Sequence, residues 1–180
     1  PNVEKVVILC SKADMPSTKF SEVISYEELL SMGRENFQWV EGEETDACGI
    51  CYTSGTTGNP KGVVYTHRSN TLHALTQAAP DMLNLSSTDT VMPVVPLFHA
   101  NGWSIAYTAP LVGSSIVFPG GDLSPSSLYD MLERGVTMTA AVPTVWLLLL
   151  NFLESEQKKL SSLERVVIGG SSCPRSVIED

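Results

Sequence analysis

The strongest chemical signal in the chain is a loop rich in hydroxyl groups and glycine, Tyr52-Thr53-Ser54-Gly55-Thr56-Thr57-Gly58-Asn59-Pro60-Lys61-Gly62. Glycine allows backbone N–H groups to converge on an anion, Ser and Thr add hydroxyl donors, and Lys61 brings a positive charge to a triphosphate. This pattern predicts a phosphate-binding loop. It is not a Walker A loop, because that motif requires glycine directly before the lysine and Ser or Thr directly after it, whereas Pro60 and Gly62 stand there.

The alternative for this segment is a solvent-exposed hairpin, since Ser, Thr, Gly and Pro are common turn residues. A solvent loop does not require four hydroxyl side chains within the five residues 53–57, together with glycines and a lysine. A phosphate site uses each of these groups, so the sequence favours the phosphate-binding loop.

Short runs rich in β-branched residues alternate with helical patterns along the chain. Strands are predicted at 6–10, 47–53, 62–66, 90–95, 115–118, 137–142 and 165–169. Helices are predicted at 26–32, behind a capping box of Ser25 and Glu28, and at 69–79, 125–134 and 143–153. This alternation predicts an α/β fold with a mostly parallel sheet and flanking helices.

The segment 137–169 is expected to form a βαβ unit, because both of its strands and the helix between them are almost entirely apolar. In an open α/β sheet, ligands bind beyond the carboxyl ends of the strands. Two further segments follow strands, as the hydroxyl-rich loop does: Val95 to Trp103 (VPLFHANGW) and Gly169 to Pro174 (GGSSCP). The three segments are therefore expected to meet at one site.

The composition disfavours several classes of protein. A formal net charge of -9, with no cluster of Lys and Arg, argues against nucleic acid as a partner. No transmembrane segment is predicted, because the most apolar stretch, Val145 to Leu153, is far shorter than the roughly 18–20 residues required, and the opening residues lack a secretory pattern. Cys48 and Cys51 lie in a predicted strand, which does not suit a redox pair. We expect two buried thiols in a reducing cytosol and a cytoplasmic protein.

The hydroxyl-rich loop resembles the signature of the adenylate-forming superfamily, which includes acyl-CoA synthetases, luciferases and peptide-synthetase adenylation domains. The core Pro96-Leu97-Phe98-His99 resembles its acyl-pocket segment, and Gly169 to Pro174 resembles its glycine-rich turn beside the adenosine. Trp103 and the sequence VPTVW at 142–146 are most similar to bacterial medium- and long-chain fatty acyl-CoA synthetases. The chain thus resembles an internal piece of the large N-terminal domain of such an enzyme.

This resemblance implies the ATP-dependent activation of a fatty acid to an acyl-adenylate and then to acyl-CoA, with ATP, Mg²⁺ and coenzyme A as small-molecule partners. The fatty carboxylate is the nucleophile, so the protein supplies alignment and charge neutralisation. The implied phosphate ligands are Thr53, Ser54, Gly55, Thr56, Thr57, Gly58 and Lys61, and the adenosine is bordered by Gly169, Gly170 and Ser171. Lys61 and His99 are the implied catalytic residues, Thr53 the Mg²⁺ ligand, and His99, Ala100 and Trp103 the substrate-binding residues.

Two of these residues also have a structural interpretation. A lone histidine such as His99 is often a hydrogen-bonded core residue, although its place in the matched motif favours a substrate pocket. Trp103 is either an aromatic core residue at a helix start or a residue that lines or closes the acyl tunnel.

By the same resemblance, residues 1–45 form a first strand, helix and acidic connection, and residues 46–180 carry the three motifs. The superfamily's downstream glutamate, ribose-binding aspartate and small C-terminal domain with its catalytic lysine are not in this sequence, so the chain alone is expected to be inactive. A homodimer of the full-length protein is left open. The alternatives are an aryl-CoA or luciferase-like ligase and a nucleotide-binding module without catalysis.

Overall fold

The computed structural model describes residues 4–53 and 58–179, and the chain divides into two compact units, Pro1–Glu41 and Gly42–Asp180. The first unit pairs strands β1 (Val6–Ile8) and β2 (Val23–Ser25) in parallel, with a 3-10 turn η1 (Lys12–Asp14) between them and helix α1 (Tyr26–Ser31) after them. Helix α1 begins where predicted, because the Ser25 hydroxyl and the Glu28 carboxylate each accept the other residue's backbone N–H. Strand β2 was not predicted, since three residues are too few to show a period.

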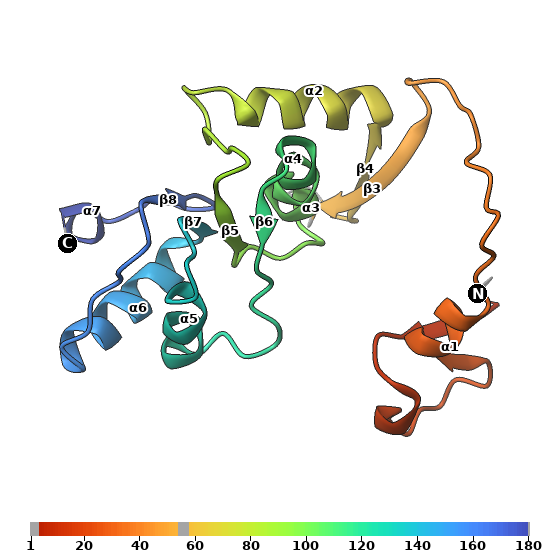
Figure 1. Ribbon diagram of the computed structural model, residues 1–180, viewed down its shortest axis with the longest axis horizontal. Coiled ribbons are helices and arrows are strands. Elements are labelled where there is room, and N and C mark those ends of the chain that lie inside the picture. The colour runs from red at the N-terminus through yellow and green to blue at the C-terminus, as the bar shows by residue number, and fades with distance from the viewer. Residues whose placement is uncertain (1–3, 54–57, 180) are drawn as a thin grey trace. The chain divides into compact units, whose positions relative to one another are not determined.

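The second unit carries all three motifs (Figure 1). Its elements in chain order are β3 (Ala47–Thr53), β4 (Lys61–Thr66), α2 (His67–Ala78), β5 (Thr90–Pro93), α3 (Ala100–Trp103), α4 (Ile105–Val112), β6 (Ser115–Ile116), α5 (Pro125–Leu132), β7 (Met138–Ala141), α6 (Pro143–Ser155), β8 (Arg165–Ile168) and α7 (Arg175–Glu179). Every predicted strand and helix is present. Helix α2 starts two residues before its predicted start, because the Thr66 hydroxyl accepts the backbone N–H of Ser69 and caps the helix there.

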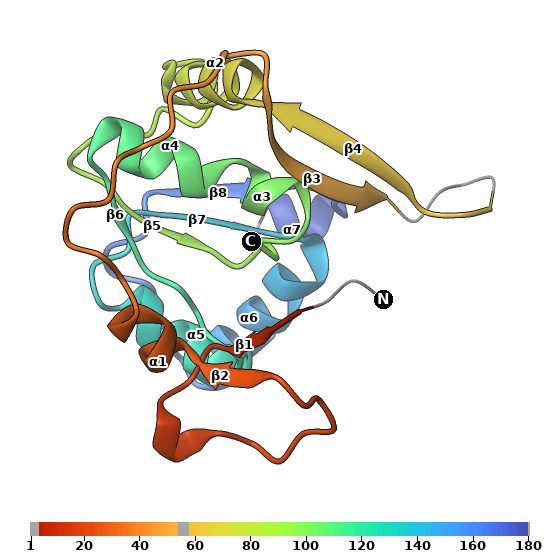
Figure 2. The same cartoon turned by 90° about the vertical axis from the view of Figure 1, so that its right-hand side faces the viewer.

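A four-stranded parallel sheet lies at the centre of the second unit, with the order β6-β5-β7-β8. Strands β7 and β8 are joined by α6, which confirms the predicted βαβ unit and the α/β class. Strands β3 and β4 form a separate antiparallel hairpin. Figure 2 shows α4 and then α2 on one side of the parallel sheet, and α5 and α6 on the other. Among the described residues, no helix combines the length and apolarity that crossing a bilayer requires.

Each face of the parallel sheet has its own apolar core, because neighbouring residues of a strand point to opposite faces. On the side of α4, Val91 of β5 and Met138 and Ala140 of β7 pack with Ile105 and Ala109. The other face packs against α5 and α6 and contains Met92, Ala141, Leu128, Leu132, Trp146 and Leu149. Both faces are covered, as expected for parallel strands.

The cysteine prediction was partly wrong. The CGICY segment is a strand as expected, and the described cysteines are all free thiols. Cys48, however, is exposed rather than buried, and its sulfur accepts a 3.2 Å hydrogen bond from the Asn70 amide. The β3–β4 hairpin lies outside the parallel sheet, so one of its faces stays open to solvent.

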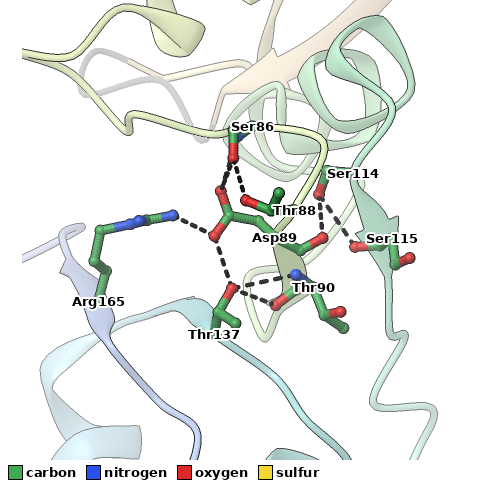
Figure 3. Close-up of polar contacts among 8 residues, drawn as sticks. All are labelled: Ser86, Thr88, Asp89, Thr90, Ser114, Ser115, Thr137 and Arg165. Atoms are coloured by element: carbon green, nitrogen blue, oxygen red, sulfur yellow. Dashed lines mark hydrogen bonds and ion pairs between the residues drawn. The ribbon is translucent and has the colours of Figure 1, made fainter.

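A polar cluster around Asp89 holds the amino ends of the parallel strands together (Figure 3). Asp89 directly precedes β5 and is only 5% exposed. Its carboxylate accepts hydrogen bonds from Thr137 Oγ1 (2.8 Å) before β7, from Arg165 (2.6 Å) at the start of β8 and from the backbone N–H of Ser86 (2.8 Å). Its backbone carbonyl accepts the N–H of Ser115 at the start of β6. One residue therefore connects all four strands.

The same contacts set the charge state of Asp89. Burial by itself raises the pKa of this carboxyl, but the hydrogen bonds from Thr137 and Ser86 and the Arg165 guanidinium outweigh it and hold the pKa below its ordinary value. A carboxyl with a lowered pKa in the folded state stabilises the fold above its unfolded pKa, and this contribution is lost as the pH falls through the folded pKa.

We predict that Asp89→Asn in the complete protein lowers the free energy of unfolding at neutral pH by about 1.5–3 kcal/mol, because charge-assisted hydrogen bonds are lost. The difference between variant and wild type should shrink as the pH falls through the lowered pKa of Asp89, where the wild-type carboxyl itself becomes protonated. Urea unfolding at neutral and acidic pH measures both effects.

The matched control is Glu44→Gln, which breaks the exposed ion pair of Glu44 with Arg68. Exposed pairs contribute little, so this variant should unfold like the wild type. Equal unfolding midpoints for Asp89→Asn and Glu44→Gln would show that the Asp89 cluster does not hold the sheet.

Candidate functional site

The β3–β4 hairpin positions the two ends of the hydroxyl-rich loop. Thr53, the last residue of β3, is opposite Lys61, the first residue of β4, and Thr53 Oγ1 lies 3.5 Å from the Lys61 carbonyl oxygen. Both side chains are exposed, so the hydroxyl and the ammonium group are accessible to a ligand. Gly58 has φ 129°, a conformation that requires glycine. Ser54, Gly55, Thr56 and Thr57, which were also predicted ligands, lie outside the described residues.

The segment after β5, which contains α3 (Ala100–Trp103), makes a left-handed turn that the sequence did not predict. Five consecutive residues have positive φ: Ala100 (46°), Asn101 (56°), Gly102 (63°), Trp103 (54°) and Ser104 (63°). Gly102 adopts this conformation without strain and Asn101 tolerates it, whereas Ala100, Trp103 and Ser104 cost roughly 1–2 kcal/mol each. Such strain persists only where the surroundings enforce it, and it clusters at functional sites.

Trp103 lies directly against the glycine turn that follows β8. A Cβ atom built on Gly169 would lie 2.8 Å from Cη2 of the Trp103 indole, closer than real Cβ contacts allow. A larger residue at 169 would therefore have to displace the indole, although the φ of Gly169 would accept one. Trp103 is half-buried and also packs against the core on the α4 side of the sheet, so it belongs to the core and to the site at once.

The hairpin also contacts the left-handed turn. Cys51, two residues before Thr53, has its sulfur 3.6 Å from Asn101 Oδ1. The structure thus joins the β3–β4 hairpin to the segment after β5, and that segment to the turn after β8. The expected meeting of all three segments also involves residues 54–57, which lie outside the described residues, so it stays a prediction.

The remaining predicted site residues border the same segments. His99 is exposed rather than packed in the core, and its backbone N–H donates to the Pro96 carbonyl at 3.0 Å. Ala100 is half-buried and opens the left-handed turn. Gly170 (φ 83°) and Ser171 are exposed beyond Gly169.

Sequence reasoning missed one residue that touches the site, Gln77 of α2. It is 5% exposed, and its Nε2 donates a 2.6 Å hydrogen bond to the Trp103 carbonyl oxygen. The signal was present: Asn70, Ala74 and Gln77 recur at helical spacing and are the buried residues of α2. A glutamine on the buried stripe of a helix requires a partner for its amide.

The described residues do not contain a group of three or more His, Cys, Asp and Glu side chains that could hold a metal ion. The exposed Thr53 hydroxyl is an oxygen donor of the kind that Mg²⁺ prefers, but a single one. A Mg²⁺ ion here would take its other ligands from phosphate oxygens and water, which is common for this ion.

Comparison with known proteins gives close relatives. The chain is 45% identical over 181 residues to a medium-chain-fatty-acid–CoA ligase of Ectopseudomonas oleovorans, an alignment that covers 100% of this chain and 33% of the relative. It is 50% identical over 156 residues to a long-chain-fatty-acid–CoA ligase of Thermus thermophilus, covering 86% of this chain and 28% of that protein. The chain therefore spans about a third of the length of the curated relatives it matches.

Solved structures with a similar fold are, by their names, also coenzyme A ligases or synthetases. The structure of a long-chain-fatty-acid–CoA ligase from Archaeoglobus fulgidus superposes with a TM-score of 0.76 and 29% identity, over 88% of this chain and 33% of that one. The AMP-bound O-succinylbenzoate coenzyme A synthetase of Bacillus subtilis superposes with a TM-score of 0.70 and 29% identity, over 88% and 40%. Residues 2–180 match the family model described as AMP-binding enzyme, and the chain accordingly belongs to the family of AMP-binding enzymes.

Proposed function

We propose that the complete protein activates a medium- or long-chain fatty acid with ATP and transfers the acyl group to coenzyme A. The observation that carries this proposal is the contact of Trp103 with Gly169. It joins the segment assigned to the acyl group to the turn assigned to the adenosine, and an enzyme that links a carboxylate to AMP requires these two groups side by side. The 45% and 50% identities to fatty-acid–CoA ligases support the class of acid.

In the proposed reaction a carboxylate oxygen attacks the α-phosphorus of ATP and pyrophosphate leaves. The coenzyme A sulfur then attacks the acyl carbon and AMP leaves. The role of the chain is alignment and charge neutralisation. Lys61, with the hydroxyls and backbone N–H groups of 53–58, would hold the β- and γ-phosphates, and His99 would face the reacting carboxylate from the exposed start of the left-handed turn.

The adenosine and the acyl group would lie on either side of the Trp103–Gly169 contact. Gly169, Gly170 and Ser171 would border the adenosine, while Ala100 and Trp103 would contact the acyl group. Thr53 would contribute its hydroxyl to a Mg²⁺ ion, which neutralises phosphate charge when bound. A cytoplasmic location and a homodimer of the complete protein are parts of the same proposal, supported by the resemblance alone.

A second candidate concerns the acid. The chain is also 40% identical, over 99% of its length, to a 3-methylmercaptopropionyl-CoA ligase of Ruegeria pomeroyi, which favours a short acid with a thioether. ATP–pyrophosphate exchange by the complete protein, with fatty acids of increasing length, 3-methylmercaptopropionate and aryl acids, decides between them. No exchange with any of these acids, together with retained ATP binding, would favour a nucleotide-binding module.

We predict that Lys61→Ala in the complete protein slows the adenylation half-reaction by about one to two decades, because one charge-assisted contact to a phosphate is lost. Lys61 is exposed, so the thermal unfolding midpoint should not change. Lys159→Ala, which removes an exposed lysine beyond the end of α6, is the control and should leave the rate unaltered. Equal exchange rates for both variants would remove Lys61 from the mechanism.

We predict that Gly169→Ala weakens the affinity for the acid, because the new methyl group displaces the Trp103 indole. The φ of Gly169 lies outside the left-handed region, so the variant adds bulk without backbone strain. Gly121→Ala is the matched control, since nothing lies within 4 Å of its added Cβ.

A double-mutant cycle isolates this contact. In a Trp103→Ala background the clash is absent, so Gly169→Ala should then have little effect. Acid affinity measured by calorimetry for the four proteins gives the coupling. An unchanged effect of Gly169→Ala in both backgrounds would mean that the indole is not what position 169 accommodates.

A further inference from the structure

The left-handed turn at 100–104 requires an anchor outside itself. Ala100, Trp103 and Ser104 hold a backbone conformation that such residues avoid. The buried Ser104 hydroxyl adds to the cost, since it has no hydrogen-bond partner in the part of the chain that the structure describes. Contacts from another element must therefore favour this conformation over a relaxed one.

Gln77 of α2 supplies such a contact. Its Nε2 donates to the Trp103 carbonyl oxygen at 2.6 Å, in the middle of the strained backbone. The side chain is 5% exposed, so water competes little for this hydrogen bond. The bond is made to the backbone of Trp103, and it thus fixes the peptide from which the indole projects towards Gly169.

Thr108 of α4 fixes the Gln77 amide in turn. Its hydroxyl donates to Gln77 Oε1 at 2.8 Å and lies 3.1 Å from the Ser104 carbonyl oxygen, and the residue is fully buried. With Oε1 occupied by the Thr108 donor, Nε2 is the atom that faces the Trp103 carbonyl. The three residues form a chain from α4 through α2 to the strained turn, which we call the Gln77 clasp (Gln77, Thr108 and the Trp103 carbonyl).

The position of Gln77 in the fold connects two parts of the site. Helix α2 begins directly after β4, where the Thr66 hydroxyl caps it, and β4 is the strand that leaves the hydroxyl-rich loop at Lys61. The same helix ends one residue after Gln77, beside the left-handed turn. The element that leads away from the proposed phosphate site therefore also anchors the proposed acyl segment.

We propose that Gln77 is a positioning residue for the acyl site, which acts through Trp103. This rests on the proposed function. The clasp holds the turn at 100–104 in its left-handed form and keeps the indole against Gly169. Among the described residues, the hydrogen-bond partners of the Gln77 side chain are Trp103, Thr108 and His73 and include no proposed phosphate ligand. Loss of Gln77 should therefore alter the use of the acid and leave the use of ATP nearly unchanged.

The test uses Gln77→Leu in the complete protein, which keeps the size of the side chain and removes its hydrogen bonds with the Trp103 carbonyl and Thr108, together with a longer contact of 3.4 Å with His73 Nε2. We expect the KM for the acid to rise about tenfold, the effect of losing one buried hydrogen bond, while the KM for ATP stays within about twofold. Thr76→Val, the neighbouring exposed residue on α2, is the control and should change neither constant. Equal increases in both KM values would overturn the proposal.

Action through Trp103 is tested by combining variants. In a Trp103→Ala background, Gln77→Leu should have little further effect on the KM for the acid. A full tenfold effect in that background would show that Gln77 does not act through the indole and would overturn the proposal.

Thr108 keeps the proposal testable if Gln77→Leu does not fold. Thr108→Val removes the hydroxyl at constant shape and should reproduce the selective rise in the KM for the acid. Thr108→Ser keeps the hydroxyl and should restore the wild-type value. If Val and Ser behave alike, the hydroxyl is not part of the clasp.

A ¹⁹F NMR measurement, which does not depend on enzyme activity, tests the Gln77 clasp separately from the proposed function. In complete protein labelled with 5-fluorotryptophan, the ¹⁹F resonance of Trp103 is the one lost in Trp103→Phe. Gln77→Leu and Thr108→Val should shift or broaden it, whereas Thr76→Val should not. An unmoved resonance overturns the clasp, whereas a moved resonance in a protein that activates no acid supports the clasp and refutes the proposed function.

Discussion

Asp89 is the constraint on which the arrangement of the second unit depends. It binds the amino ends of four parallel strands through its carboxylate and its backbone carbonyl, and every site segment that follows the sheet leaves from the carboxyl end of one of these strands. A parallel strand cannot shift its register without moving the residues beyond it. Fixing the amino ends of the strands therefore fixes the spacing of the residues beyond their carboxyl ends, where Trp103 contacts Gly169.

The architecture was predictable because it depends on patterns that are local in sequence. The apolar β-branched runs gave the strands, and the Ser25 and Ser124 caps placed the starts of two helices. Helix α4 was not among the predicted helices, although one interpretation of Trp103 set it at a helix start. Pro110 lies inside this helix and weakens its local signal. The left-handed turn was also unpredictable, because its carbonyl at Trp103 accepts a hydrogen bond from Gln77, which is 26 residues away and has no local signature of this partner.

The candidate site also has some residues that local sequence patterns predict and others that only the fold reveals. The proposed phosphate loop could be predicted from residue types, because the chemistry it would perform needs hydroxyls, glycines and one lysine at short spacing. The contact between Trp103 and Gly169 spans 66 residues of sequence and depends on the strand order β5-β7-β8, which periodicity does not reveal. The core interpretation of Trp103 describes part of its surroundings, because the indole packs against the core on the α4 side, whereas its role at an acyl tunnel stays a proposal.

The absence of a side chain at 169 has a consequence for how this family can diverge. The size of the residue at 169 is limited by the bulk of Trp103 and not by the backbone angles of Gly169. This limit therefore depends on which residue stands at 103. Lineages in which a smaller residue replaces the tryptophan at 103 are released from it and are free to carry alanine or serine at 169. The two positions should therefore vary together across the family. In each lineage, replacement of the tryptophan at 103 should precede the appearance of a larger residue at 169.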